Sequence, residues 1–326
     1  MENIPLVSIG IDVSKAKLDV ACLAADQSVT AGQFENTRVG IGLLQEFLDT
    51  QKTAKAVPCV VESTGDYHLL VAVMLSQAGF KTCVINPLIT KQYQKSSIRQ
   101  AKTDKIDAER LARIGQLETN LRLFTGSLES IASAKLTSLL AKTEKVSQQL
   151  KASVKRFEDT KNMLSLPLPA FAVFQETIDS MELTIQTLKK EIVARAPRQS
   201  AEIAAAVKGV SATQTAILFS VLSEKHFDNR DQLVAFVGLD VKKRQSGSWQ
   251  GKEKLSKRGN GYLRKILYQI AWGLKTHNQT FKDYYERVYK KEKKHYTTTL
   301  IAIARKFLRF LYAYYWQKTI CPQPVI

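Results

Sequence analysis

The alternation of apolar and polar residues predicts a domain of mixed strands and helices over residues 1–120. Apolar runs of strand length occur at residues 6–12, 17–23, 29–34, 56–61 and 81–85. Helical spacing of apolar residues is found at 39–51, 67–78 and from 103 onward. Short turns join the first three runs, which is typical of an antiparallel meander. The predicted order is therefore βββ-α-β-α-β-α.

Four carboxylates lie at the ends of these elements. Asp12 ends the first strand and Glu62 ends the fourth, whereas Asp104 and Asp107 begin the last helix. The predicted order is that of an RNase H-like α/β domain, in which the first and fourth strands are central neighbours, so we expect these side chains to converge. Carboxylate oxygens bind Mg²⁺, and two such ions can hold the attacking and leaving oxygens of a phosphodiester. The sequence predicts a phosphoryl-transfer site for Mg²⁺, with Mn²⁺ as the alternative ion.

Residues 125–195 have a different pattern, in which apolar residues repeat at intervals of three and four. The segment Leu166-Pro167-Leu168-Pro169 must interrupt the helix, because proline removes a hydrogen bond and clashes with the preceding turn. The pattern predicts an antiparallel hairpin or an intermolecular coiled coil, with two ordinary core helices as the alternative. We therefore expect three domains, at residues 1–122, 123–198 and 199–326.

The net charge of +18 is concentrated in one part of the chain. Residues 241–310 carry 19 Lys and Arg against four Asp and Glu, whereas residues 1–120 carry 13 of each kind. Such a segment attracts a polyanion, because each phosphate contact releases counterions. Apolar and aromatic residues are interspersed, so we do not expect a disordered tail. The pattern predicts nucleic-acid binding, with a solvated basic face as the alternative.

A possible helix-hairpin-helix turn precedes this basic segment at Val207-Lys208-Gly209-Val210-Ser211. In that motif, backbone N–H groups and a helix N-terminus bind a phosphate. Lys208 stands where the motif usually has proline, and Ser211 stands where it has a second glycine. An ordinary connection between two helices explains the segment equally well.

A glycine-rich, basic stretch from 236 to 265 forms the second candidate site. Ser246 and Ser248 lie in a loop flanked by glycines, and a serine hydroxyl attacks a phosphodiester when nearby groups favour its alkoxide. Composition alone leaves an ordinary loop as the alternative. The residues predicted to bind nucleic acid are Lys242, Lys243, Arg244, Lys257, Arg258, Asn260, Arg264 and Lys265.

The cysteines, apolar runs, aromatic residues and histidines narrow the class of protein to be expected. The four cysteines, Cys22, Cys59, Cys83 and Cys321, have no C-x-x-C spacing, so we expect them to be reduced and structural. We expect no signal peptide, because no basic and apolar leader begins the chain, and no apolar run approaches the roughly 18 residues of a membrane span. Most C-terminal aromatic residues have helical spacing and are expected in the core, although some suit base stacking. The histidines show no metal-binding spacing. We expect a cytosolic protein with no membrane partner.

Together these motifs resemble the DEDD insertion-sequence transposases and the Piv/MooV-type invertases. The matching segments run in family order from about residue 12 to 265. They are Ile9-Gly10-Ile11-Asp12 followed by Lys15 and Lys17-Leu18-Asp19, Val61-Glu62-Ser63-Thr64-Gly65, Val84-Ile85-Asn86-Pro87, Lys102-Thr103-Asp104-Lys105-Ile106-Asp107-Ala108, Gly238-Leu239, Ser246-Gly247 and Ser256-Lys257-Arg258-Gly259-Asn260-Gly261-Tyr262-Leu263-Arg264.

The resemblance implies a RuvC-like N-terminal domain whose four carboxylates bind Mg²⁺, a linking coiled coil, and a mainly α-helical C-terminal transposase domain. It implies a serine nucleophile, best matched by Ser246, with Ser248 as the alternative. It also implies donor and target DNA as substrates and a structured bridge RNA from the element that pairs with both. Composite sites in a homo-oligomer, a dimer or a tetramer, would explain the coiled coil. Such a protein would be bacterial and cytoplasmic, and nucleoid-associated when acting.

Three alternatives remain from the residues themselves. A junction resolvase or nuclease would use the acidic residues with water as the nucleophile, and would not need Ser246. A tyrosine recombinase would use the tyrosine-rich tail, but the Arg…His-x-x-Arg…Tyr series is missing. A non-enzymatic nucleic-acid scaffold would have a degenerate first domain, which the presence of all four carboxylates disfavours.

Overall fold

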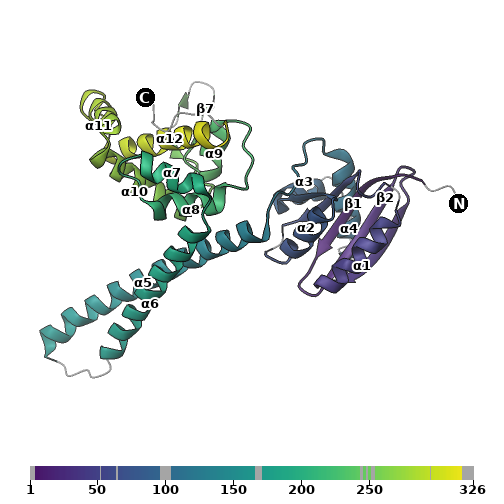
Figure 1. Cartoon of the computed structure of the whole chain (residues 1–326), viewed down its shortest axis with the longest axis horizontal. Helices are drawn as coiled ribbons and strands as arrows, with labels where there is room; N and C mark the ends of the chain where they lie inside the picture. Colours follow the sequence, from purple (N-terminus) through teal and green to yellow (C-terminus); the bar gives the residue numbers. More distant parts are fainter. Residues whose placement is uncertain are drawn as a thin grey trace. The chain divides into compact units, whose positions relative to one another are not determined.

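The protein, seen here as a computed structural model, divides into two compact units, Met1–Leu128 and Glu129–Ile326. The first unit contains the five-stranded sheet, and the second is mainly helical (Figure 1). The structure describes residues 4–51, 53–63, 65–95, 104–165, 171–242, 245–246, 249–250, 254–293 and 295–317.

The first unit is built on a five-stranded mixed sheet with the order β3-β2-β1-β4-β5. Its strands are β1 (Leu6–Val13), β2 (Lys17–Ala24), β3 (Val29–Glu35), β4 (Pro58–Glu62) and β5 (Lys81–Ile85). The first three form an antiparallel meander, and β1, β4 and β5 are parallel neighbours. All five predicted strands are confirmed, and the sheet has the order expected for an RNase H-like domain.

Four helices accompany the sheet in the described residues of this unit: α1 (Arg38–Asp49), α2 (His68–Gln77), α3 (Pro87–Lys95) and α4 (Asp104–Leu117). The sequence did not predict α3, because Pro87 suggested the end of a strand only. Proline is also well suited to the first position of a helix, and the Asn86 Oδ1 accepts a hydrogen bond from the Leu88 N–H at 2.9 Å. The N-cap of α2 is Tyr67, and no side chain makes a capping hydrogen bond there.

The two faces of the sheet are covered differently. On one face, Ile9, Ile11 and Val61 pack in a core with Leu44 of α1 and Leu75 of α2. On the other face, α4 packs directly on β1 and β2. The approach is very close: a Cβ atom added at Gly10 would lie 2.1 Å from the Ala108 carbonyl oxygen. Gly10 therefore allows α4 to lie against the centre of the sheet.

The predicted structural role of three cysteines agrees with their positions. Cys22, Cys59 and Cys83 are free and buried in β2, β4 and β5. Burial raises the pKa of Cys22 to about 12 and that of Cys83 to about 11. These thiols are therefore protonated and unreactive near neutral pH. Cys321 lies outside the described residues.

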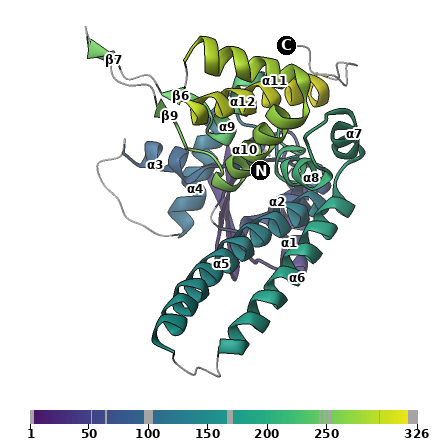
Figure 2. The same cartoon turned by 90° about the vertical axis from the view of Figure 1, so that its left-hand side faces the viewer.

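The second unit begins with two long helices, α5 (Leu128–Leu164) and α6 (Phe171–Arg195), which run antiparallel and side by side in both views (Figures 1 and 2). Their proximal halves belong to the core of the unit through Leu140, Leu188 and Ile192. Their distal halves expose large apolar side chains, such as Met163, of which 76% is accessible to solvent. The predicted helical hairpin is confirmed, whereas its assembly into a coiled coil stays a prediction. The predicted proline interruption at 166–169 lies outside the described residues.

The rest of the second unit is mainly helical. The helices are α7 (Arg198–Ala206), α8 (Ala212–Leu222), α9 (Arg230–Val237), α10 (Gly261–His277), α11 (Gln279–Glu286), the π-helix η1 (Arg287–Lys291) and α12 (Tyr296–Tyr315). Two-residue strands separate α9 from α10: β6 (Val241–Lys242), β7 (Gln245–Ser246), β8 (Trp249–Gln250) and β9 (Lys254–Leu255). Phe281, Tyr285, Phe307 and Tyr312 are buried, as expected from their helical spacing. No helix in the described ranges is long and apolar enough to cross a membrane.

We predict that Gly10→Val lowers the free energy of unfolding by about 3 kcal/mol, because the new side chain would push α4 away from β1. Urea unfolding measures the change. Gly42→Ala is the control, since an added Cβ there meets nothing within 4 Å. In a helix, this second change should be neutral or stabilise the protein by about 0.5–1 kcal/mol. Equal stabilities for Gly10→Val and wild type would contradict the packing described.

Candidate active site

The pairing of β1 with β4 brings the first two predicted carboxylates together. Ile11 pairs with Val61 in parallel register, so the next residues along these strands, Asp12 and Glu62, are neighbours. Adjacent strands lie about 4.8 Å apart, and residues in register point to the same face of a sheet. Both side chains are partly buried. The predicted meeting of the two strand ends is confirmed at the level of the backbone.

The two carboxylates lie on the face that α4 covers. Side chains alternate along a strand, so Asp12 shares its face with Gly10, and Glu62 shares its face with Val60. Gly10 meets α4 at Ala108 and Ala112, and Val60 packs with Leu111 and Ile114. Asp12 and Glu62 therefore point away from the core formed with α1 and α2.

The direction of α4 places its N-terminal end near these carboxylates. Gly115 of α4 approaches Ser8, and Ala108 and Ala112 approach Gly10, so α4 runs opposite to β1. The step from Gly10 to Asp12 along β1 is about 7 Å, which is the length of four to five residues of an α-helix. The segment of α4 that extends toward Asp12 is therefore its first turn, where Asp104 and Asp107 lie.

Helical spacing places Asp104 and Asp107 in line with the residues of α4 that contact the sheet. Ala108, Leu111 and Gly115 form the stripe of α4 that contacts the strands. Asp104 precedes Ala108 by four residues and Asp107 precedes Leu111 by four, so both extend this stripe. The Asp107 side chain is partly buried and accepts a hydrogen bond from the Arg110 Nη1. The side chain of Asp104 lies outside what the structure describes.

A further carboxylate, Asp19 on β2, was not predicted as part of the site. Asp12 pairs with Asp19 across the hairpin of β1 and β2, so the two side chains point to the same face. Asp19 is buried; the Gln33 Nε2 donates to its Oδ1 at 2.7 Å, and the Lys17 Nζ lies 3.4 Å from its Oδ2. The nearly symmetric spacing of Asp12 and Asp19 around the turn was the available signal. Asp19 therefore lies beside Asp12 on this face, where Lys17 balances its charge.

The donor set fits a hard divalent cation. All four predicted ligands are carboxylates, which suits Mg²⁺ or Mn²⁺ and not the thiolate or imidazole sites typical of zinc. Among the side chains that the structure describes, no three His, Cys, Asp or Glu residues lie close enough together to hold a metal ion. Asp104 is not in that set, so the described ligands alone do not complete a site.

The predicted serine segment lies in the second unit. Val241 pairs with Leu255 and Lys242 with Lys254, which forms a short antiparallel base. Beyond it, Ser246 pairs with Trp249. Ser246 is thus in a two-residue strand, and not in an open loop as predicted. The Ser246 and Lys242 side chains, and residues Lys243, Arg244 and Ser248, lie outside the description.

The base of this segment is fixed by short contacts. The Ser256 Oγ donates a hydrogen bond to the Asp240 Oδ1, and the Ser256 N–H donates to the Asp240 carbonyl oxygen at 2.9 Å. Gly238, at φ +78°, lies so close to Gly259 that an added Cβ would be 2.6 Å from the Gly259 nitrogen. The Arg264 Nη1 donates to the carbonyl oxygens of Val237, at 3.0 Å, and Gly259, at 2.7 Å. These contacts hold the two ends of the serine segment together.

The residues predicted to bind nucleic acid divide into two groups. Lys257 and Arg258 are exposed and make no ion pair with any residue in the described ranges. Asn260 caps α10, where its Oδ1 accepts hydrogen bonds from the Tyr262 and Leu263 N–H groups. The Arg264 guanidinium is engaged by carbonyl oxygens, as described above. Lys257 and Arg258 are therefore the better placed for phosphate contacts.

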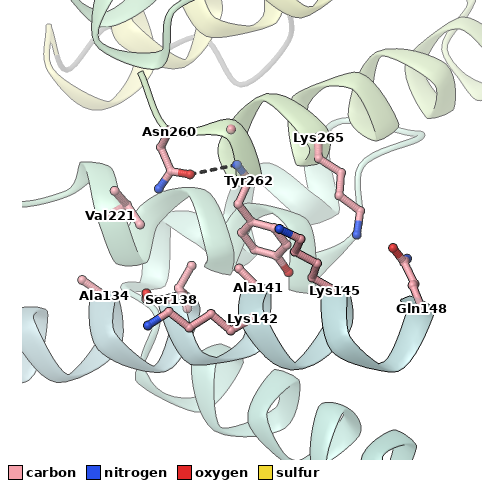
Figure 3. A pocket seen from close by; sticks show the side chains of 12 residues that line it. Ala134, Ser138, Ala141, Lys142, Lys145, Gln148, Val221, Asn260, Tyr262 and Lys265 are labelled. Atoms are coloured by element: carbon pink, nitrogen blue, oxygen red, sulfur yellow. Dashed lines mark hydrogen bonds between the residues drawn. The ribbon is translucent and has the colours of Figure 1, made fainter. Parts of the chain in front are cut away.

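Lys265 has a structural partner in α5. Its Nζ lies 2.9 Å from the Glu144 Oε2, and the Lys189 Nζ lies 2.9 Å from the Oε1 of the same carboxylate. Burial alone would raise the pKa of Glu144, but the hydrogen bonds from the two lysines outweigh it and hold that pKa below its ordinary value. Figure 3 shows Lys265 next to Tyr262 at the beginning of α10. Burial and the nearby Glu144 raise the pKa of the Tyr262 hydroxyl.

The predicted helix-hairpin-helix turn joins α7 to α8. Gly209 has φ +94°, and an added Cβ there would be 2.4 Å from the Gly273 carbonyl oxygen of α10. Ser211 forms a capping box with Gln214 at the start of α8. The segment thus has the turn glycine and the helix N-terminus of such a motif, and DNA binding by it stays a prediction.

The chain is similar to known transposases over most of its length. Residues 9–162 match a family model described as Transposase, of the DEDD type of IS110, and residues 201–286 match one described as Transposase IS116/IS110/IS902 family. A putative transposase y4rJ of Sinorhizobium fredii is 27% identical over 71% of this chain and 70% of its own length. The pilin gene-inverting proteins of Moraxella bovis and Moraxella lacunata are each 27% identical over 94% of both chains.

We predict that Glu144→Gln lowers the free energy of unfolding by about 1–2 kcal/mol near neutral pH, because two lysines lose their carboxylate. The pKa of Glu144 is lowered from 4.5, so its ion pairs stabilise the fold above that pH and are lost as the pH falls below it. The difference from wild type should therefore shrink in acid. Chemical unfolding at several pH values measures it.

Glu191→Gln is the matched control, because Glu191 pairs only with Arg195 on an exposed helix surface in the described residues. Its effect should stay within about 0.5 kcal/mol. A Glu144→Gln effect as small as this, or one that grows in acid, would contradict the assigned role of Glu144.

Proposed function

The chain belongs to the IS110 family of transposases and recombinases, and from this premise we propose how its residues cut and rejoin DNA. As a member, it is an enzyme that acts on DNA. We propose that Asp12, Glu62, Asp104 and Asp107 form the metal-binding part of the active site, in a RuvC-like domain. The parallel pairing of Ile11 with Val61 carries this proposal, because it makes Asp12 and Glu62 neighbours beneath the start of α4.

The four carboxylates would hold Mg²⁺, or Mn²⁺ in its place. When bound, such ions stabilise the negative charge that develops on a phosphodiester. Asp12 and Glu62 lie on this face because β1 pairs with β4 and because Gly10 allows α4 to pack on β1. Asp107 is further oriented by Arg110. Asp19 would hold Lys17 and Gln33 next to Asp12.

Ser246 is proposed as the nucleophile. Its Oγ attacks the phosphorus of a DNA phosphodiester and loses its proton, which forms a serine–phosphate ester. The bond from phosphorus to one deoxyribose oxygen breaks, and that oxygen takes up a proton. A hydroxyl of the recombining strand then attacks the phosphoserine, restores the phosphodiester and releases the serine. No oxidant or external energy source is required, since one ester bond replaces another at each step.

The basic segment is proposed to hold the nucleic acids. Lys257 and Arg258 are exposed beside the base of the serine segment, and Lys242, Lys243 and Arg244 precede Ser246 in sequence. The nucleic acids would be donor DNA, target DNA and a bridge RNA from the element that pairs with both. The Moraxella relatives are named for inverting a pilin gene, and inversion and insertion both require strands to be cut and rejoined.

A homo-oligomer, as a dimer or a tetramer, is proposed through the distal part of the α5–α6 hairpin. Met163, Val173 and Phe174 are large apolar residues that are exposed there. Apolar side chains of this size are typical of a protein interface when they cluster on one surface. A coiled coil between subunits would allow the acidic residues of one chain and the serine of another to form a composite site.

We predict that Ser246→Ala abolishes a covalent protein–DNA adduct when purified protein is incubated with cognate RNA, donor DNA, target DNA and Mg²⁺. The adduct should be visible as a band shift on denaturing gels after the reaction is stopped. Ser248→Ala is the matched control, because it removes the neighbouring hydroxyl and should leave the adduct intact. Loss of the adduct in Ser248→Ala alone would transfer the role to that serine. Cleaved DNA without any adduct would instead indicate a nuclease that uses water.

We predict that Asp12→Asn and Glu62→Gln each lower the recombination rate at least 100-fold, since several kcal/mol of charge stabilisation are lost with the metal. DNA binding, measured by a mobility shift, should persist in both variants. Asp26→Asn is the control, because Asp26 is a fully exposed carboxylate that contacts Ser28. Full activity in either of the first two variants would overturn the metal-site assignment.

A further inference from the structure

Three depressions in the second unit adjoin one another along α10. They have volumes of about 530, 620 and 520 Å³ and lie at the beginning, middle and end of the helix. Gln148 and Lys265 line both the first and the second, and Ser211, Gln214 and Gln269 line both the second and the third. Together they form one groove, which we call the α10 groove. It follows a helix of 17 residues, or about 25 Å.

The α10 groove is basic at its α5 side. It is lined by five lysines and two glutamates: Lys142, Lys145, Lys151, Lys189, Lys265, Glu144 and Glu182. The last three of these lysines pair with the glutamates. Lys142 and Lys145 form no ion pair with any described residue, and both project from α5 beside the start of α10 (Figure 3). Two cations are therefore available for an anionic ligand.

The opposite end of the α10 groove is aromatic. Tyr268 and Trp272 lie one turn apart on α10, and 37% and 52% of their surfaces are exposed. Both line the depression next to the Gly209 turn and Ser211. Flat aromatic surfaces suit the faces of nucleobases, which stack on them. The groove thus combines available lysines at one end with stacking surfaces at the other.

We propose that the α10 groove binds a single strand of nucleic acid, with its phosphates at Lys142 and Lys145 and a base stacked on Trp272. This inference rests on the proposed function and adds a binding site for one of its strands. A duplex would conceal the faces of its bases from Trp272 and Tyr268. An acidic peptide would satisfy the lysines, but it has no comparable flat surfaces for the aromatic end. The four glutamines that line the groove, Gln148, Gln186, Gln214 and Gln269, can donate and accept hydrogen bonds to base edges.

The lysine end is tested by the salt dependence of binding. The full chain is titrated into fluorescein-labelled single-stranded DNA and RNA of one sequence, and anisotropy gives Kd at several salt concentrations. In the double variant Lys142→Gln/Lys145→Gln, two phosphate contacts are lost. The slope of log Kd against log salt concentration should therefore fall by about 1.4, or about 0.7 for each contact. Lys155→Gln with Lys190→Gln removes two exposed lysines of the same hairpin that lie outside the groove. This control should keep the slope of the wild type.

The aromatic end is tested by Trp272→Ala. Loss of one stacked base should weaken single-strand binding by about 5- to 100-fold and leave the salt slope unchanged. Tyr67→Ala, which removes an exposed aromatic ring of the first unit, outside the groove, should leave Kd unchanged. Both variants alter exposed side chains, and circular dichroism confirms that they are folded. If single-stranded DNA and RNA bind with different affinities, the one that binds more tightly is identified as the ligand of the α10 groove.

Three outcomes would overturn the inference. Wild-type affinity and salt slope in the groove variants would place binding elsewhere on the chain and leave the proposed function intact. Tighter binding of duplex, unaffected by Trp272→Ala, would exclude a single strand. Displacement of the oligonucleotide by polyglutamate at equal charge concentration would indicate an acidic protein partner. Wild type that binds no nucleic acid at all would overturn the proposed function as well.

Discussion

The close contact between α4 and β1 is the constraint on which the candidate active site depends. Gly10 has no side chain, so the backbone of α4 at Ala108 and Ala112 reaches the centre of the sheet. The same contact sets the direction of α4 and extends its first turn toward Asp12. The parallel pairing of β1 with β4 then brings Glu62 to the same place. Backbone packing, and not the carboxylates themselves, therefore brings Asp12, Glu62 and the first turn of α4 to the same edge of the sheet.

Much of this arrangement could be predicted from the sequence because it depends on local patterns. Apolar runs defined the five strands, and their order implied that Asp12 and Glu62 would be neighbours. Asp19 was missed because its position depends on the register of a hairpin, which the pattern alone does not fix. The helix α3 was missed because Pro87 both ends an extended segment and begins a helix. The surroundings of Ser246 depend on contacts between segments that are distant in sequence, such as that of Asp240 with Ser256. A local sequence pattern does not predict such contacts.

The second unit uses many of its polar side chains to hold its own structure. Arg264, Asn260 and Lys265 all looked like phosphate ligands in the sequence, since they lie in a basic, glycine-rich segment. In the structure, Arg264 donates to carbonyl oxygens, Asn260 accepts from helix N–H groups, and Lys265 pairs with Glu144. A count of charges along a sequence does not distinguish cations in ion pairs from cations that can bind a ligand. Only the fold shows that Lys142, Lys145, Lys257 and Arg258 form no ion pair with a described residue. Binding surfaces in this unit are thus defined by what the fold leaves unpaired.

The most direct test of the central claim is Mn²⁺ binding by purified protein, followed by electron paramagnetic resonance. If residues from two strands and one helix form one site, Asp12→Asn, Glu62→Gln, Asp104→Asn and Asp107→Asn should each weaken binding at least tenfold, whereas Asp26→Asn should not. Unchanged affinity in both Asp104→Asn and Asp107→Asn would contradict the account, because the first turn of α4 would then not contribute to the site.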